Sequence, residues 1–245
     1  SMSGERGHLS EVVMEQILSS YSPHEREMRK NGRPSIGSGL VFPLGEEKIM
    51  VEPFPLEDHW PRIAAIDFGW DHPTAVVWAA IDREDETFYI YDCYRASKAS
   101  PTVHASVIRS RPHFIPIAYP HDGNRRDSMG NPGLADQYRN LGCNFLLGHF
   151  TNPPALGNNK GSNSIEEGLM AMLQSVEAGK FKVFSNLSDW FEEFRMYHRK
   201  DNKVVPLRDD LMSATRYAFQ SQRFAVAGED PAWTKDVEYQ NYGIV

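Results

Sequence analysis

Cysteine and long apolar runs are scarce in this sequence, and each shortage excludes a class of protein. Cys93 and Cys143 are the two cysteines among its 245 residues, and they lie too far apart for a short metal-binding motif. No stretch approaches the roughly 18 to 20 apolar residues that a membrane helix requires. The opening Ser1-Met2-Ser3-Gly4 lacks the features of a signal peptide and is typical of the scar of a cleaved expression tag. We therefore expect an intracellular protein in a reducing compartment, without a disulfide framework.

Positive charge is also in deficit. The chain has 26 Lys and Arg against 33 Asp and Glu, which gives a formal net charge of -7 at pH 7. A protein with this balance binds nucleic acid only through a local basic surface, or through metal ions that neutralise clustered carboxylates. The hydrophobic share of 40% is ordinary and supports one domain of good size with flanking segments.

From residue 61 onward the sequence has a regular pattern of strands and helices. Three strands, at 62–67, 74–81 and 86–94, are predicted to form an antiparallel meander. A helix at 101–109 and a strand at 114–119 follow, and then a second helix at 132–141 and a fifth strand at 143–147. This order predicts an α/β fold with a mixed five-stranded sheet and helices on both faces.

The segments on either side of this pattern are less regular. Residues 34–60 are rich in Gly and Pro and are predicted to be a lead-in arm outside the core. After the fifth strand we expect a loop at 149–163, a helix at 164–179 and a short strand at 181–184. Two further helices are predicted, at 189–197 and 209–223.

Acidic residues recur at equivalent places in this pattern. Asp67 ends the first strand, Asp122 follows the fourth, and Asp209 and Asp210 begin the last helix. Neighbouring strand ends lie close together, and a helix packed on the sheet brings its first turn to the same spot. Carboxylates that converge repel one another unless a divalent cation neutralises them, and an all-oxygen set favours Mg²⁺ or Mn²⁺ over Zn²⁺. Two such ions roughly 3.5 to 4 Å apart support in-line attack of water on a phosphodiester.

Each acid also has a purely structural explanation. Asp67 and Asp122 stand in sequences that are common in turns, and acids at a helix start are favoured by the unpaired amides and the helix dipole. The combination of order, spacing and placement at strand ends favours the metal site. Asp71 and Asp127 are second-tier metal ligands that surface turns explain equally well.

Cations cluster near the acids despite the negative total. They are candidates for contacts with DNA phosphates, the alternative being a solvated surface. The candidates are Arg125, Arg126, Lys160, Arg195, Arg199, Lys200, Lys203 and Arg208.

Four stretches together resemble the nuclease domain of tailed-bacteriophage terminase large subunits, most closely the headful-packaging group. They are Trp60-Pro-Arg-Ile-Ala-Ala-Ile-Asp67-Phe-Gly-Trp-Asp-His-Pro-Thr-Ala, Tyr119-Pro-His-Asp122-Gly, Asn163-Ser-Ile-Glu-Glu-Gly168 and Asp209-Asp-Leu-Met-Ser-Ala-Thr-Arg-Tyr217-Ala. The resemblance implies a ribonuclease H-like fold and a metal-dependent endonuclease that cuts concatemeric double-stranded viral DNA during genome packaging. It implies two Mg²⁺ or Mn²⁺ ions on Asp67, Asp122 and Asp209 or Asp210.

The resemblance also implies the setting of the protein. The partners would be DNA, the small terminase subunit, the portal and the procapsid, in the host bacterial cytoplasm and not in the mature virion. An isolated domain of this kind is expected to be monomeric and away from membranes.

Two departures from the family bear on these expectations. Many relatives have Asp-His followed two residues later by Asp-Ala, whereas this chain has Asp209-Asp210 and then Ser213-Ala214, so the choice of metal ligand stays open. The sequence also contains no Gly-x-x-x-x-Gly-Lys-Ser/Thr phosphate loop. We therefore expect a fragment that cuts DNA without translocating it. Residues 1–58 would be the tag scar and the arm from a missing ATPase domain, 59–225 the nuclease domain and 226–245 a tail.

Two other functions are compatible with parts of the sequence. Asp67-Phe-Gly69 followed by Thr74 resembles the phosphate turn of actin-like and sugar-kinase-like ATPases, but that fold needs a second lobe with a second such turn. A non-catalytic docking module that has kept the fold is the third possibility, and the presence of all three acidic positions disfavours it.

Overall fold

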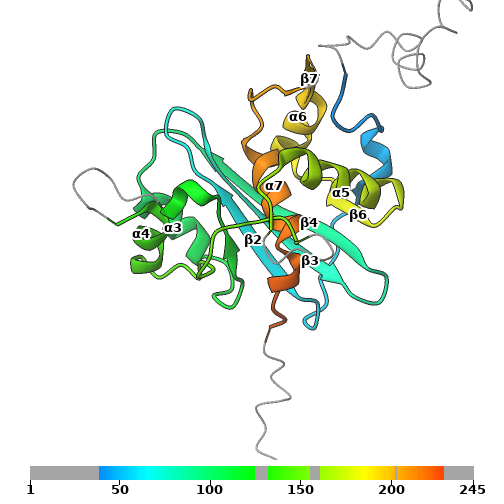
Figure 1. Cartoon of the computed structure of the whole chain (residues 1–245). Coiled ribbons are helices and arrows are strands. Elements are labelled where there is room, and N and C mark those ends of the chain that lie inside the picture. Colours follow the sequence, from blue (N-terminus) through cyan, green and yellow to red (C-terminus); the bar gives the residue numbers. More distant parts are fainter. Residues whose placement is uncertain (1–38, 125–131, 155–160, 202, 229–245) are drawn as a thin grey trace, which may run out of the picture.

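The computed structural model of the protein describes residues 39–124, 132–154, 161–201 and 203–228. A twisted mixed sheet runs through the centre of the molecule, with helices on both faces (Figure 1). Among the described residues, no helix is both long and apolar enough to cross a membrane.

The sheet has six strands in the order β1-β6-β4-β3-β2-β5. The pairs β2–β3 and β3–β4 are antiparallel, which confirms the predicted meander, and the pairs β1–β6, β4–β6 and β2–β5 are parallel. The strands are β1 (Met50–Val51), β2 (Arg62–Asp67), β3 (Thr74–Asp82), β4 (Thr87–Ala96), β5 (Ile117–Ala118) and β6 (Phe181–Phe184).

The prediction of five strands is wrong at both edges of the sheet. Residues 143–147 make a single bridge, from Phe145 to Ile117, and are not a strand. At the other edge β1 pairs with β6, and Ile49 beside it is fully buried. The expectation that residues 34–60 stay outside the core is therefore also wrong. A strand of two residues is too short for the alternation of apolar and polar side chains to reveal it.

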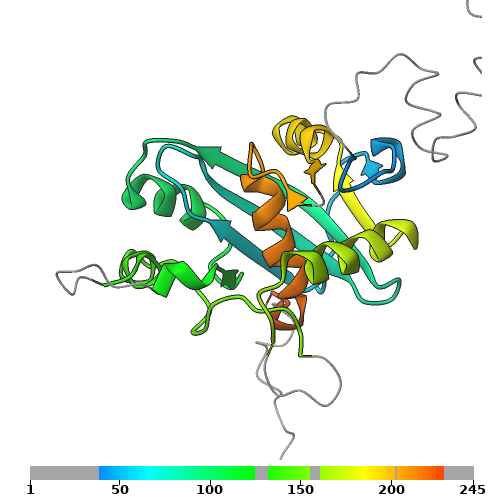
Figure 2. The same ribbon diagram turned by 45° about the horizontal axis from the view of Figure 1, so that its top comes forward.

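The helices cover the two faces of the sheet separately. Alternate residues of a strand point to opposite faces, so Ala64 and Ile66 pack toward α3 (Pro101–Arg109) and α4 (Leu134–Asn140). Ile63 and Ala65 face the other way and share a core with the remaining helices. These are α5 (Ile165–Glu177), α6 (Ser188–Met196) and α7 (Asp210–Gln220). Figure 2 shows α7 lying on the sheet between α5 and α6.

Local sequence signals explain where most helices begin and end. Helix α3 matches its predicted range, with Pro101 in the first turn, where its missing N–H costs nothing. The Oγ of Ser164 accepts a hydrogen bond from the N–H of Glu167 at 3.3 Å and caps α5. That helix ends before Gly179, whose φ of +75° suits glycine. The last predicted helix is shorter than expected: α7 ends at Gln220, and a 3₁₀ turn, η3 (Gln222–Phe224), follows.

Candidate active site

Three elements carry the predicted acids to one end of the sheet. Asp67 is the last residue of β2. Asp122 lies in η2 (His121–Asn124), a 3₁₀ turn that follows β5, the parallel neighbour of β2. Gly123 in that turn sits against the ring of Phe68, where an added Cβ would come within 2.7 Å of the ring. This close approach holds Asp122 beside the end of β2.

The third element is α7, which packs across β2 and β3. Asp209 is its N-cap residue and Asp210 its first helical residue. Further along the helix the Tyr217 side chain is hydrogen-bonded to Asp67. Asp210 and Tyr217 are seven residues, or about two turns, apart and so share one face of the helix. That face is turned toward Asp67.

The electrostatics of Asp67 show that the acids converge. Burial of its carboxyl group and the negative charges of Asp210, Asp209 and Asp122 raise the pKa of Asp67 from 3.8 to about 8, against an opposing effect of Arg216. Burial also raises the pKa values of Asp209 and Asp210. The structure therefore brings together the four acids that the sequence singled out.

The donor set suits a divalent cation by its chemistry. It consists of mutually repelling carboxylates, and a bound Mg²⁺ or Mn²⁺ would relieve the repulsion that raises the pKa of Asp67. Within the described ranges, no three Asp, Glu, His or Cys side chains are gathered tightly enough to hold an ion as they stand. The acids thus face one another without forming a closed ligand set.

Two residues in the middle of α7, Arg216 and Tyr217, also act on Asp67. Neither was predicted from the sequence as a site residue. The guanidinium carbon of Arg216 lies 4.7 Å from the ring centre of Tyr217 and 5.3 Å from that of Phe150. The Arg216 side chain is buried, and its Nε and Nη1 atoms have no hydrogen-bond partner in the described chain. Both residues belong to the motif that begins at Asp209, but nothing in the sequence shows that they point toward the acids.

A third missed residue, Glu193 of α6, lies behind the acids. It is fully buried and accepts hydrogen bonds from the backbone N–H groups of Leu211 and Met212 in the first turn of α7. Burial raises the pKa of Glu193 to about 7, and its bonds with Leu211 and Arg95 act in the opposite direction. The signal in the sequence is an acid three residues after Trp190, on the apolar face of an amphipathic helix.

A cleft of about 280 Å³ opens beside Asp210. Its other lining residues are His72, Pro73, Arg95, Glu192, Leu207 and Arg208. The charge of His72 acts to lower the pKa values of both Asp209 and Asp210. Asp71, the second-tier candidate, is exposed in the loop between β2 and β3.

The cations predicted to contact DNA are partly engaged with acids of the protein. Arg195 pairs with Glu46 at 2.8 Å, and Arg199 pairs with Glu166 at 2.5 Å. Arg208 pairs with Glu192 at 2.9 Å. Lys200 and Lys203 belong to a two-stranded hairpin, β7 (Arg199–Lys200) and β8 (Lys203–Val204). Four predicted site residues lie outside the described part of the chain: Arg125, Arg126, Asp127 and Lys160.

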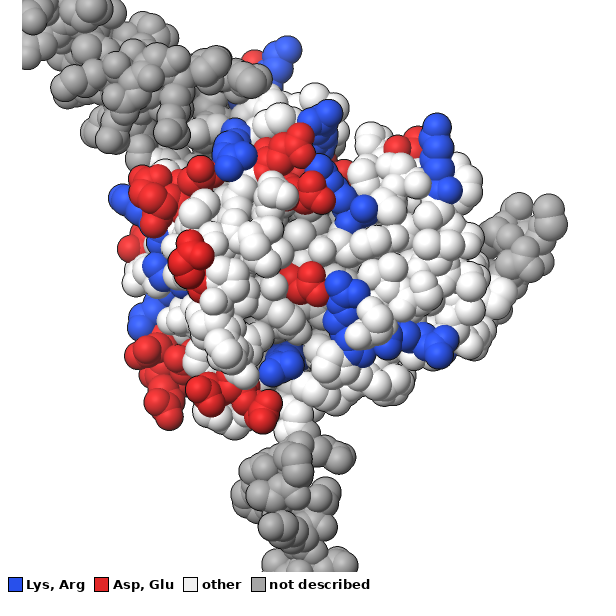
Figure 3. Space-filling model, turned by 180° about the vertical axis from the view of Figure 1, so that it is seen from behind, with Lys and Arg blue, Asp and Glu red and all other residues white. Residues whose placement is uncertain are grey.

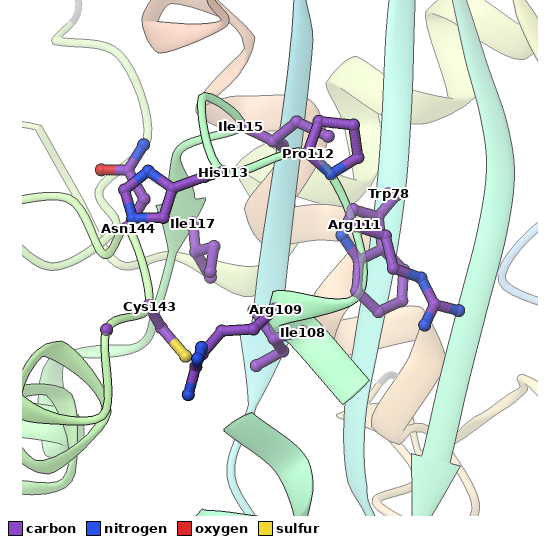
Figure 4. A pocket seen from close by; sticks show the side chains of 11 residues that line it. Trp78, Ile108, Arg109, Arg111, Pro112, His113, Ile115, Ile117, Cys143 and Asn144 are labelled. Carbon is purple, nitrogen blue, oxygen red and sulfur yellow. The ribbon is translucent and has the colours of Figure 1, made fainter. Parts of the chain in front are cut away.

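A second pocket lies on the other face of the sheet and is unrelated to the acids. Figure 4 shows residues of α3, β3 and β5 around it, with the Arg111 side chain beside Trp78. The guanidinium carbon of Arg111 is 4.6 Å from the centre of the Trp78 ring system. The volume of this pocket, about 20 Å³, is room for about one water molecule. It is too small for a substrate.

Known proteins are similar to this chain in sequence. Residues 64–222 match the family described as "Terminase RNaseH-like domain". The terminase large subunit of Salmonella phage P22 is 38% identical over 219 residues, which are 89% of this chain and 43% of that protein. The corresponding protein of Enterobacteria phage LP7 is 38% identical over 213 residues, 86% of this chain and 44% of its own length. The chain thus spans less than half the length of these relatives.

Solved structures extend the comparison to three dimensions. The nuclease domain of the P22 large terminase superposes with a TM-score of 0.71 at 36% identity, covering 79% of this chain and 97% of that domain. The large terminase of a thermophilic bacteriophage, at 13% identity and a TM-score of 0.58, covers 88% of this chain and 53% of its own length and shares the fold. The predicted ribonuclease H-like fold is confirmed, and the chain belongs to the terminase RNase H-like domain family.

Proposed function

We propose that this chain is a divalent-metal-dependent endonuclease that cuts double-stranded viral DNA during genome packaging. The observation that carries the proposal is the convergence of Asp122, Asp209 and Asp210 on Asp67, seen in the raised pKa of Asp67. Membership of the terminase family supports a nuclease and gives no support to the actin-like ATPase.

Asp67, Asp122 and Asp210 are the residues that we propose hold one or two Mg²⁺ or Mn²⁺ ions. Asp210 acts more strongly on Asp67 than Asp209 does, so we place Asp210 first of the pair. Such ions, when bound, activate water and stabilise the charge that develops on a phosphate. Tyr217 orients the Asp67 carboxylate, and a cleft of about 280 Å³ opens beside Asp210.

The wider setting follows from the family. The P22 relative is a terminase large subunit, and we propose the same role in host cells for the protein to which this chain belongs, with the small subunit, the portal and the procapsid as partners. Arg195, Arg199, Lys200 and Lys203 would contact DNA phosphates. For the two arginines, such contacts require an exchange of their present partners, Glu46 and Glu166.

Cleavage of supercoiled plasmid in the presence of Mn²⁺ tests the proposal. We expect the chain to nick and linearise the plasmid. We expect EDTA or Asp67→Asn to reduce the rate by about 100-fold or more, because EDTA removes the metal ions and the substitution removes one of their proposed ligands. Asp85→Asn is the matched control, since Asp85 is an exposed acid in the β3–β4 turn, at the other end of the sheet. Cleavage by a folded Asp67→Asn variant at the wild-type rate would sink the assignment.

A further inference from the structure

The first turn of α7 is capped by a residue from another helix. Asp209 occupies the N-cap position, yet its side chain makes no capping hydrogen bond. Two backbone amides of this turn are bound by Glu193 of α6 instead. The Oε2 of Glu193 accepts a hydrogen bond from the N–H of Leu211 at 2.7 Å and one from the N–H of Met212 at 3.4 Å. Leu211 and Met212 are the second and third residues of the helix.

These two amides are the ones that an N-cap aspartate normally binds. An Asp side chain at that position folds back onto the N–H of the second or third helical residue. Because Glu193 already occupies both, the carboxylate of Asp209 is not drawn into the helix end.

Arg95 of β4 fixes Glu193 in this place. Its Nη1 donates to Oε1 of Glu193 at 3.0 Å, and its Nη2 contacts Glu192 at 2.6 Å and Asp189 at 3.2 Å. A buried carboxylate is retained only when such partners offset the loss of water. The contacts therefore join the sheet, α6 and the first turn of α7 into one support.

We infer that Glu193, held by Arg95, is a positioning residue of the acid site. By capping α7 it leaves the carboxylates of Asp209 and Asp210 available to a metal ion. The inference rests on the proposed role of these two acids in metal binding.

Substitution of Glu193 separates positioning from simple stability. In Glu193→Ala the freed amides capture the Asp209 carboxylate, so we expect the Mn²⁺ concentration for half-maximal plasmid cleavage to rise by roughly fivefold or more. The rise in Tm that Mn²⁺ produces should shrink in parallel, since it reports metal binding without cleavage. Glu193→Gln keeps an acceptor for the amides, and we expect half-saturation within about twofold of wild type.

Thr215→Val is the matched control. The Nε1–H of Trp190 donates to Oγ1 of Thr215 at 2.8 Å, which is a buried bond between the same two helices, away from the first turn of α7. Its loss should lower Tm while leaving the half-saturating Mn²⁺ concentration unchanged. If Glu193→Ala does not fold, Glu193→Asp replaces it, since the shorter side chain keeps its charge but withdraws from the amides.

The outcomes are distinct. Glu193→Ala, or Glu193→Asp in its place, overturns the positioning role if it lowers Tm like Thr215→Val without changing the Mn²⁺ response. A wild-type protein that shows neither Mn²⁺-dependent cleavage nor a Mn²⁺-dependent rise in Tm overturns the proposed function, and the positioning role with it.

Discussion

Among the four acids of the site, Asp67 has the carboxyl group that burial and neighbouring negative charges make hard to ionise. Asp67 is half-buried near three other carboxyl groups, and its pKa is about 8 instead of 3.8. The positive charge of Arg216 acts in the opposite direction and offsets only part of this cost. The metal-free protein therefore carries a repulsion that a bound cation would remove.

This repulsion predicts a pH dependence of folding. A carboxyl group with a higher pKa in the folded chain holds its proton more tightly there, so the free energy of unfolding falls as pH rises from about 4 to about 8. Asp67→Asn removes the ionisable carboxyl group, and with it this fall in the free energy of unfolding. In EDTA we expect the variant to be more stable than wild type at pH 8.5, by on the order of a few kcal/mol, and nearly equal at pH 4. Urea unfolding at both pH values measures the difference.

The same gain at both pH values would contradict this account. It would mean that the substitution acts through packing or hydrogen bonding, because neither depends on ionisation of Asp67. Titration with Mn²⁺ at pH 8.5 provides the control: added metal should stabilise wild type more than Asp67→Asn.

Among the elements, the loop between β2 and β3 is held closed by its own hydrogen bonds. Thr74 closes it: its Oγ1 donates to the Gly69 carbonyl at 2.9 Å and accepts from the Gly69 N–H at 3.2 Å. At Gly69 an added Cβ would lie 2.3 Å from the carbonyl oxygen of His72 and 2.5 Å from that of Pro73. The loop leaves no space for a side chain at this position.

Gly69→Ala should therefore open the loop that follows Asp67. We expect a loss of roughly 1 to 3 kcal/mol of unfolding free energy, because rigid backbone atoms must move apart. We also expect a fall in Mn²⁺-dependent cleavage larger than the loss of stability explains. Thermal unfolding and plasmid cleavage measure the two effects. Gly148→Ala is the control, since nothing lies within 4 Å of an added Cβ there; equal effects of the two substitutions would exclude the steric explanation.

At the scale of the whole molecule, the charge distribution restricts where DNA can bind. Figure 3 shows acidic side chains gathering toward the lower left of the rear face, and a short row of basic side chains running from its middle toward the lower right. Helix α7, which begins at Asp210, lies on the opposite side of the sheet (Figure 1). We therefore expect DNA on the α7 side, with few phosphate contacts and help from metal ions.

Lys200→Ala tests this orientation. Lys200 is exposed in the β7–β8 hairpin, and a lost phosphate contact should weaken DNA binding more at about 50 mM than at about 200 mM salt, lowering the slope of log K against log salt by about 1. Fluorescence anisotropy with a labelled duplex measures it. Arg83→Ala, in the acidic β3–β4 turn, should leave the affinity unchanged. An equal loss at both salt concentrations would argue against a contact between Lys200 and phosphate.

Much of the fold could be predicted because its signals are local. The apolar run that ends at Asp67 predicted β2, and Pro101 predicted the start of α3. The edges of the sheet could not be predicted in this way: β1 is two residues long, and residues 143–147 form one bridge in place of a strand. Edge pairing depends on contacts between segments that are far apart in the sequence, and a local pattern does not record such contacts.

The sequence by itself determined that acids stand at the ends of elements, at Asp67, Asp122 and the Asp209-Asp210 pair. Only the tertiary structure decided what surrounds them: that Asp210 acts on Asp67 more strongly than Asp209 does, that Tyr217 bonds Asp67, and that Glu193 caps α7. The physical reason is the separation along the chain of the residues that interact. Strand and helix signals arise from neighbours along the chain, whereas charge coupling and capping between helices depend on distances that exist only once α6, α7 and the sheet have packed together.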